Sequence, residues 1–130
     1  MTPDDRKYTK DHEWVLLDGQ HAELGITDHA QRELGDIVFV ELPAVGDRFA
    51  AGDRFAVVES VKAVSNVYTP IAGEITAVNN ALENEPELLN GAPYEQFLVQ
   101  LRVEAINGIE LLDAAGYDAH ITESQVVPRA

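Results

Sequence analysis

One lysine in this 130-residue chain occupies a position that could accept a covalent group. Lys62 lies between residues 54–60 and 64–68, two segments rich in β-branched and aromatic residues that are predicted to form strands. The predicted tip, residues 61–63, has none of the Gly, Asn or Asp residues that ordinary tight turns favour. The only other lysines lie within the first ten residues. An exposed amine at a hairpin tip can form an amide with an acyl group once it loses its proton.

Sulfur is almost absent from the polypeptide, which has no cysteine and a single methionine, Met1. Disulfide and thiolate chemistry are therefore excluded from the chain itself, and redox or thiol chemistry would need an attached group. The four histidines show no metal-ligand spacing, so we expect no metal site. Neither a nucleophile elbow nor a glycine-rich phosphate loop is present. We expect a protein that is not an enzyme.

The elements that would position Lys62 are mostly β-strands. A helix is predicted at 28–34, with Thr27 as N-cap and Gly35 just past its end. A second helix is predicted from Pro86 until Asn90-Gly91, and a weaker one at 106–115. Apolar and alternating patterns predict strands at 13–17, 20–26, 36–42, 54–60, 64–68 and 97–103. In the C-terminal region, the residues expected to dock on the core are Ile109, Leu111 and Leu112, and those after Thr122 are expected to be loose.

An internal repeat is visible around the predicted hairpin. Residues 40–47 and 67–74 share the pattern Val-x-x-Pro-x-x-Gly-acid, and Pro43 and Pro70 lie 27 positions apart. Each unit is too short to bury its own apolar face, so the two are expected to pack face to face. The predicted fold is mostly β, a flattened barrel-like sandwich with a few short helices, one of them C-terminal.

The length predicts a single domain over 1–130. Its core is expected at about 8–103, a C-terminal helical segment at about 105–122, and flexible residues at 1–6. Nine basic and 23 acidic residues give a net charge of −14, which argues against nucleic acids and anionic membranes as partners. No apolar run is long enough to span a bilayer. The first residues do not look like a signal or transit peptide, so we expect a cytoplasmic protein of bacterial type rather than a mitochondrial matrix protein. We also expect a monomer.

Several motifs together resemble one known family. Glu59-Ser60-Val61-Lys62-Ala63, with Gly73 beyond it, resembles the lipoylation hairpin of the glycine cleavage system H proteins. The match runs in order from about Tyr8 to Tyr117, and the further segments that carry it are Tyr8-Thr9-Lys10-Asp11-His12-Glu13-Trp14, residues 24–31, residues 34–43, residues 85–90 and Pro93-Tyr94. Independent motifs in one register are far more specific than a lone pentapeptide.

This resemblance implies a lipoyl/biotinyl-carrier-like hybrid fold and a carrier function. Lys62 would hold lipoate in amide linkage, and Glu59 and Gly73 would help the modifying enzyme to recognise the hairpin. The arm would receive an aminomethyl group from a pyridoxal-phosphate glycine decarboxylase and pass it to a tetrahydrofolate-dependent aminomethyltransferase. A flavin-dependent dihydrolipoyl dehydrogenase would reoxidise the arm, and a lipoyl- or octanoyl-transferring enzyme would attach it.

The resemblance also implies a cleft that shelters the loaded arm, but the match there is partial. Glu13 occupies the place of a family cleft acid. Glu33 stands where family members often have His, Asn66 where they often have Asp, and residues 95–98 are shorter than their counterpart. A lipoyl or octanoyl relay, in which the same hairpin donates its acyl group to other lipoyl proteins, is the alternative function. A regulatory homologue that is never modified is disfavoured by the intact hairpin motif, and a biotin carrier by the lack of methionines beside Lys62.

Overall fold

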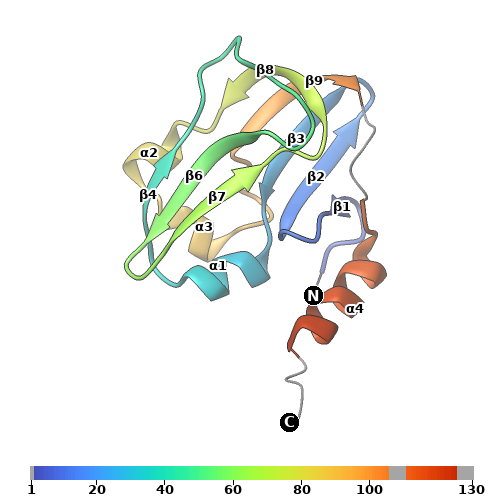
Figure 1. Ribbon diagram of the computed structural model, residues 1–130. Helices are drawn as coiled ribbons and strands as arrows, with labels where there is room; N and C mark the ends of the chain where they lie inside the picture. The colour runs from blue at the N-terminus through green and yellow to red at the C-terminus, as the bar shows by residue number, and fades with distance from the viewer. Residues whose placement is uncertain (1, 106–110, 126–130) are drawn as a thin grey trace.

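The computed structural model describes residues 2–105 and 111–125, and these form two facing β-sheets with short helices at one end (Figure 1). Among the described residues, the larger sheet has six strands in the order β1-β2-β3-β9-β8-β5, and the smaller has three, β4-β6-β7. The strands are β1 (Lys7–Tyr8), β2 (Glu13–Asp18), β3 (His21–Ile26), β4 (Ile37–Glu41), β5 (Arg48–Phe49), β6 (Arg54–Ser60), β7 (Val64–Tyr68), β8 (Ala72–Val78) and β9 (Val99–Ala105). The predicted mostly β sandwich with short helices is confirmed, and the larger sheet does not close into a barrel.

The core fills the space between the two sheets. The core residues come from the inward-facing sides of the strands, where side chains recur with the two-residue period of a strand. The small sheet contributes Val40, Val58 and Val67, all at most 2% exposed, and the large sheet contributes Leu24 and Val99 among others. One cluster therefore spans both sheets and fixes the β6–β7 hairpin on a rigid base.

The predicted repeat has a structural counterpart around β6. β4 and β7 both run antiparallel to β6, one on each side, with Val40 opposite Val58 and Val67 opposite Ala56. Beyond β4, the amide of Gly46 donates to the carbonyl of Ile75 (2.8 Å). This bond links the end of the first repeat unit to β8, just after the end of the second unit. β4 and β7, the first strands of the two units, thus lie on either side of β6 in one sheet, and not face to face as predicted.

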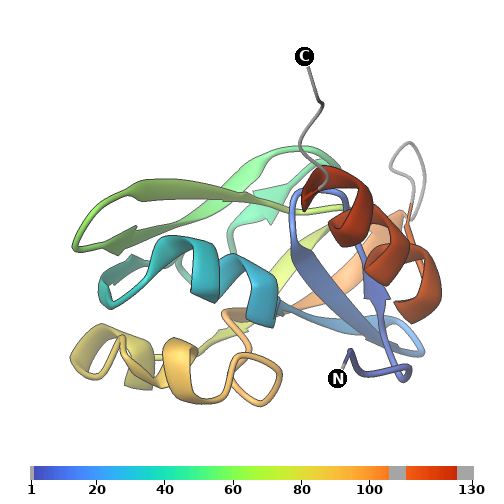
Figure 2. The ribbon, with the colours of Figure 1, turned by 90° about the horizontal axis from the view of Figure 1, so that it is seen from below.

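Helix α1 (Asp28–Leu34) has the predicted bounds. Thr27 Oγ1 accepts from the amide of Ala30 (3.2 Å), and Gly35, with φ of 79°, ends the helix. Two further short helices, α2 (Ala81–Asn84) and α3 (Leu88–Gly91), follow β8. Viewed from below, α1 lies between the β6–β7 hairpin and the α2–α3 segment (Figure 2).

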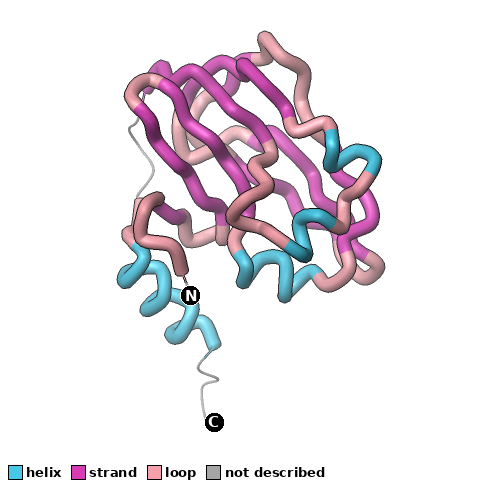
Figure 3. Tube along the Cα trace, turned by 180° about the vertical axis from the view of Figure 1, so that it is seen from behind, coloured by secondary structure: helices cyan, strands magenta, loops and turns pink. Residues whose placement is uncertain are grey.

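The C-terminal helix lies later in the chain than predicted. α4 spans Ala114–Gln125 and is placed beside β1, away from the hairpin tip (Figure 3). The predicted helix over 106–115 is wrong at residues 111–113, because Leu112 instead exchanges two backbone hydrogen bonds with Tyr8 (2.7 and 2.8 Å). Residues 106–110 of this predicted helix, Ile109 among them, lie outside the described residues. Leu111 and Leu112 do pack on apolar clusters, as predicted.

Three other sequence expectations also need adjustment. The helix predicted after Pro86 is displaced to Leu88–Gly91, and α2 was not predicted. β9 starts and ends two residues later than the predicted 97–103. α4 continues past Thr122 to Gln125, so the chain is still helical where it was expected to be loose.

The segment before β1 makes specific contacts with the rest of the molecule. The guanidinium of Arg6 lies 4.6 Å from the ring centre of Trp14 and donates to the carbonyl of Tyr94 (2.9 Å). The flexibility of residues 1–6 stays a prediction. None of the helices described has the length and apolar character needed to cross a membrane.

Candidate functional site: the Lys62 hairpin and its surroundings

The tip of the β6–β7 hairpin presents Lys62 to solvent. A serine hydroxyl organises the turn that the glycine-free sequence left unexplained. Ser60 Oγ accepts from the amides of Lys62 (3.3 Å) and Ala63 (3.0 Å), and the Ser60 amide donates to the Ala63 carbonyl (2.8 Å). A serine that bonds the backbone two and three residues ahead forms a local turn of this kind. Lys62 therefore sits on a fixed turn rather than on a loose loop.

The end of α1 supports the tip from the side. The amide of Val61 donates to the carbonyl of Asp36 (3.0 Å), and a Cβ placed on Gly35 would lie 3.4 Å from Lys62 Cε. The aliphatic part of the lysine thus rests beside Gly35. Asn90 holds this junction, because its amide nitrogen donates to the Gly35 carbonyl (2.8 Å) and its oxygen accepts from the Ile37 amide (2.9 Å).

The two predicted recognition residues lie in different surroundings. Glu59 is half-buried in β6, opposite Phe39 on one side and Val64 on the other. Gly73 lies in β8, where a Cβ would come within 2.4 Å of the Leu101 side chain and 2.5 Å of the Arg102 carbonyl oxygen. Close packing of β8 on β9 is therefore sufficient reason for a glycine at position 73. The recognition roles of both residues stay predictions.

Glu13 is a buried carboxylate, only 4% exposed, that joins the two sheets. One of its oxygens accepts from the hydroxyl of Thr9 (2.7 Å), and the other accepts from the amide of Tyr68 at the end of β7 (2.9 Å). Burial raises the pKa of Glu13 to about 7, although both hydrogen bonds act to lower it. Glu13 borders a cavity of about 300 Å³, whose other lining residues are Thr9, Asp11, Gly52, Tyr68, Thr69 and Pro70.

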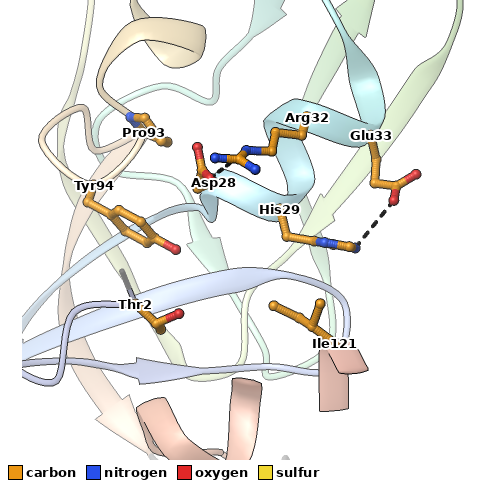
Figure 4. A pocket seen from close by; sticks show the side chains of 8 residues that line it. All are labelled: Thr2, Asp28, His29, Arg32, Glu33, Pro93, Tyr94 and Ile121. Carbon is orange, nitrogen blue, oxygen red and sulfur yellow. Dashed lines mark ion pairs between the residues drawn. The ribbon is translucent and has the colours of Figure 1, made fainter. Parts of the chain in front are cut away.

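The other two residues of the predicted arm cleft lie elsewhere. Glu33 is exposed on α1, 3.5 Å from His29 Nε2, and it borders a separate cavity of about 520 Å³ between α1 and α4 (Figure 4). Asn66 is exposed on β7, opposite Val57. The structure thus places Glu13 and Glu33 beside different cavities, and the role of the three residues toward an arm stays a prediction.

A cluster of histidines next to this second cavity was not predicted. The rings of His29 and His120 lie 4.4 and 5.7 Å from that of His12, and Tyr117 Oη is 2.8 Å from His12 Nδ1. Burial lowers the pKa of His12, as do the two neighbouring histidines. The rings come from the β1–β2 loop, α1 and α4, so no spacing in the sequence could reveal them. In the part of the chain that the structure describes, no cluster of His, Cys, Asp or Glu has a metal-binding arrangement.

Comparisons with known proteins agree with this geometry. The family model for the glycine cleavage H-protein matches residues 6–124. The glycine cleavage system H protein of Herpetosiphon aurantiacus is 53% identical over 123 residues, which are 93% of this chain and 94% of that one. The H protein of Deinococcus deserti is 54% identical over 119 residues, covering 91% and 96%.

A solved structure extends the likeness to the fold. The crystal structure of a glycine cleavage system H protein from Mycobacterium marinum aligns with a TM-score of 0.86 and 38% identity. The alignment covers 92% of this chain and 98% of that one. A match over nearly the whole chain, together with the lysine-tipped hairpin on its two-sheet base, shows that this protein belongs to the glycine cleavage H-protein family.

Proposed function

We infer that this protein is a lipoylated shuttle of the glycine cleavage system, with lipoate attached to Lys62. The observation that supports this most directly is the exposed Lys62 at a tip whose turn is closed by Ser60, in a chain that matches the family model over residues 6–124. The chain acts as a carrier rather than as a catalyst. Its role is to present one amine to a modifying enzyme and afterwards to present the attached arm to others.

Attachment is an acyl transfer in which the chain supplies the nucleophile. The neutral amine of Lys62 attacks the carbonyl carbon of an activated lipoyl or octanoyl group. A nitrogen–carbon bond forms, the bond from that carbon to its activating group breaks, and a base of the modifying enzyme takes the proton. A lysine amine is largely protonated near neutral pH, so the enzyme must bind the hairpin closely enough to remove that proton. A rigid turn on a packed sheet favours this step.

The residues around Lys62 fit a long acyl arm. The amine is exposed, and the aliphatic stem lies beside Gly35, which has no side chain. Bound lipoate would supply a disulfide that is reduced as it takes up the aminomethyl group of glycine. The protein itself has no sulfur beyond Met1, so this chemistry depends on the arm.

The glycine decarboxylase, the aminomethyltransferase and the dihydrolipoyl dehydrogenase are the partners that this role requires. While the loaded arm passes from one enzyme to the next, a site on the protein that shields it from bulk water would stabilise it. The cavity beside Glu13 is one candidate shelter for the arm. Tyr68, which lines it, is at the end of β7, on the order of 13 Å along the strand from Val64 near the hairpin tip. We propose that Glu13 favours the cationic amine of the load in this cavity. Glu33 borders the separate cavity between α1 and α4, and Asn66 is exposed on β7, so neither would meet the arm in this shelter.

Mass spectrometry of the purified protein tests the attachment point. After incubation with a lipoate-attaching enzyme, the wild type should gain one lipoyl group, mapped to Lys62. Lys62→Arg should gain none, because a guanidinium stays charged and is not nucleophilic, while the matched Lys10→Arg variant is modified as the wild type is. Modification of Lys62→Arg, or a lipoyl group mapped to Lys7 or Lys10, would overturn the assignment.

Reconstitution with the glycine decarboxylase tests the shuttle role. Lipoylated protein should accept an aminomethyl group only when the decarboxylase and glycine are both supplied. A lipoylated protein that takes up no aminomethyl group but donates its acyl group to other lipoyl proteins would be a relay instead.

A further inference from the structure

An exposed apolar row crosses the small sheet next to the hairpin tip. Phe39 is 50% exposed and Val64 is 66% exposed, and Val61 at the tip is 69% exposed. Phe39 on β4 and Val64 on β7 lie opposite Glu59, one on each side, so their side chains share one face of the sheet. We refer to Phe39, Glu59, Val61 and Val64 as the hairpin face.

A distortion in β4 helps to create this face. The register between β4 and β6 shifts between Ile37 and Phe39, and the successive residues Val38 and Phe39 are both exposed, at 53% and 50%. In a regular strand, one of two successive side chains would point into the core. A bulge of this kind redirects a side chain, and here it keeps Phe39 on the solvent side although burial would be favourable.

The border of the hairpin face is acidic. Asp36 precedes β4 and Glu41 is its last residue, both are exposed, and Glu59 lies within the row. Lys62 is the one basic residue from 55 to 101, and acylation removes its charge. A protein of net charge −14 that also exposes aromatic and aliphatic side chains at this place is suited to an apolar surface bordered by lysines and arginines.

We propose that the hairpin face is the docking surface for the enzyme that acylates Lys62, and that this enzyme presents an apolar strip with a basic border. The inference rests on the proposed lipoylation of Lys62 and adds the surface that the modifying enzyme reads. Phe39 is its central contact, although it lies 23 residues before the lysine in the sequence and outside the lipoylation motif.

Reach explains why this enzyme, rather than a later user of the arm, needs the hairpin face. Before attachment, the reacting atom is Lys62 Nζ, at the end of a short side chain whose stem lies against Gly35. The activated acyl carbon must come within bonding distance of that nitrogen, so the enzyme must contact the strands on either side of the tip. Once the arm is attached, its far end can enter an active site without such close contact with β4.

The test compares Phe39→Thr and Val64→Thr with Val45→Thr. Threonine keeps the β-branched shape or β propensity, and Val45 is 63% exposed but lies in the β4–β5 turn, off the hairpin face. Acylation by a purified lipoate-attaching enzyme is followed by intact mass. The two face variants should raise KM about tenfold with little change in kcat, as expected for contacts used only in docking, and Val45→Thr should change KM less than about twofold. Unfolding midpoints equal to that of the wild type show that the fold is retained.

Two further measurements make the assignment specific. Glu59→Gln and Glu41→Gln should reduce the loss of acylation rate as salt increases, whereas Asp18→Asn, at the far β2–β3 turn, should not (Figure 1). Variants that have been fully lipoylated in long incubations should accept the aminomethyl group at rates within about twofold of the wild type.

Three results would overturn this inference while leaving Lys62 as the attachment point. One is an unchanged KM in Phe39→Thr, and another is an equal change in Val45→Thr. The third is an equal loss in acylation and aminomethyl loading, which would make the face a general surface for all users of the arm. Failure of lipoylation at Lys62 in the wild type would instead overturn the proposed function.

Discussion

Glu13 is the residue whose chemistry depends most on its surroundings. Its two oxygens receive hydrogen bonds from Thr9 and from Tyr68, on elements far apart in the sequence, and it is almost fully buried. This buried carboxylate stabilises the contact between β2 and the end of β7, but it is no longer hydrated by bulk water. Because burial outweighs the two hydrogen bonds, the pKa of Glu13 rises to about 7.

The raised pKa predicts how stability responds to pH. The folded state binds a proton at Glu13 more tightly than the unfolded state, whose carboxyl has the ordinary glutamate pKa of 4.5. The resulting stabilisation is complete below that value and is lost as the pH rises through about 7. Glu13→Gln has a carbonyl acceptor on one branch of its head group and a donor on the other, as the protonated acid does, and it has no charge at any pH. The variant should therefore not lose stability in this pH range. The free energy of unfolding of Glu13→Gln relative to wild type should rise by about 3 kcal/mol between pH 4.5 and pH 8.

Urea unfolding at several pH values measures this difference. Glu83→Gln, a change of the same type on an exposed residue of α2, serves as the control and should show a small, nearly constant difference from wild type. A Glu13→Gln difference that stays constant or falls as the pH rises would mean that the hydrogen bonds from Thr9 and Tyr68 outweigh burial.

At the scale of elements, α1 links the hairpin to the rest of the molecule. Thr27 starts the helix and Gly35 ends it, and Asn90 of α3 bonds the backbone at that end. The Lys62 stem lies at the same place. The junction after α1 is therefore both a helix terminus and a support for Lys62.

The backbone at Gly35 predicts a specific cost of substitution. Its φ of 79° and ψ of −154° lie in a region that is essentially restricted to glycine. Gly35→Ala should therefore lower the free energy of unfolding by about 1–3 kcal/mol. A Cβ there would be in ordinary contact with Lys62 Cε at 3.4 Å, so backbone strain rather than a clash causes the loss.

Gly91→Ala is the matched control for this prediction. Gly91 is the last residue of α3, has no positive φ, and no atom lies within 4 Å of the position that a Cβ would take. Alanine at this position should leave stability unchanged or raise it by up to about 1 kcal/mol. Equal effects of the two substitutions in thermal unfolding would show that the conformation of Gly35 carries no special strain.

Elements with strong local signals were predictable from the sequence, and those held by distant contacts were not. α1 has its cap and its terminal glycine in the sequence, and β6 and β7 are rich in β-branched and aromatic residues. α4 was placed too early because residues 106–115 carry apolar side chains, whereas its start depends on Asp113, whose carboxylate accepts from the Gly116 amide (2.8 Å). Leu112 is extended because it pairs with Tyr8, more than a hundred residues away.

At the scale of the whole molecule, the candidate site was only partly predictable for the same reason. Lys62 and Glu59 belong to one local hairpin, so their arrangement follows from the strand pattern. The burial of Glu13 and its separation from Glu33 depend on how β7 packs beside β2 and on which side of α1 faces α4. Phe39 is exposed because of a register shift between β4 and β6, and no residue type in the sequence indicates such a shift.

The excess of acidic residues affects the stability of the whole molecule. The sequence carries 23 acidic and nine basic residues, a net charge of −14. Favourable surface pairs exist, such as Arg102 with Glu74 (2.7 Å) and Arg32 with Asp28 (2.7 Å). Exposed pairs of this kind contribute less than about 1 kcal/mol each, and the unpaired excess of acids repels itself over longer distances.

Salt should therefore stabilise this protein. Raising the ionic strength from about 0.01 M to about 0.15 M shortens the Debye length from about 30 Å to about 8 Å, which screens the long-range repulsion more than the short contacts. We expect the unfolding midpoint to rise with sodium chloride over this range. The double variant Asp18→Asn/Glu83→Gln, with a net charge of −12 instead of −14, should unfold at a higher temperature than wild type in low salt and respond less to added salt. A midpoint that falls with salt in both proteins would show that the surface ion pairs outweigh the net repulsion, and that the acidic surface is locally balanced despite its total charge.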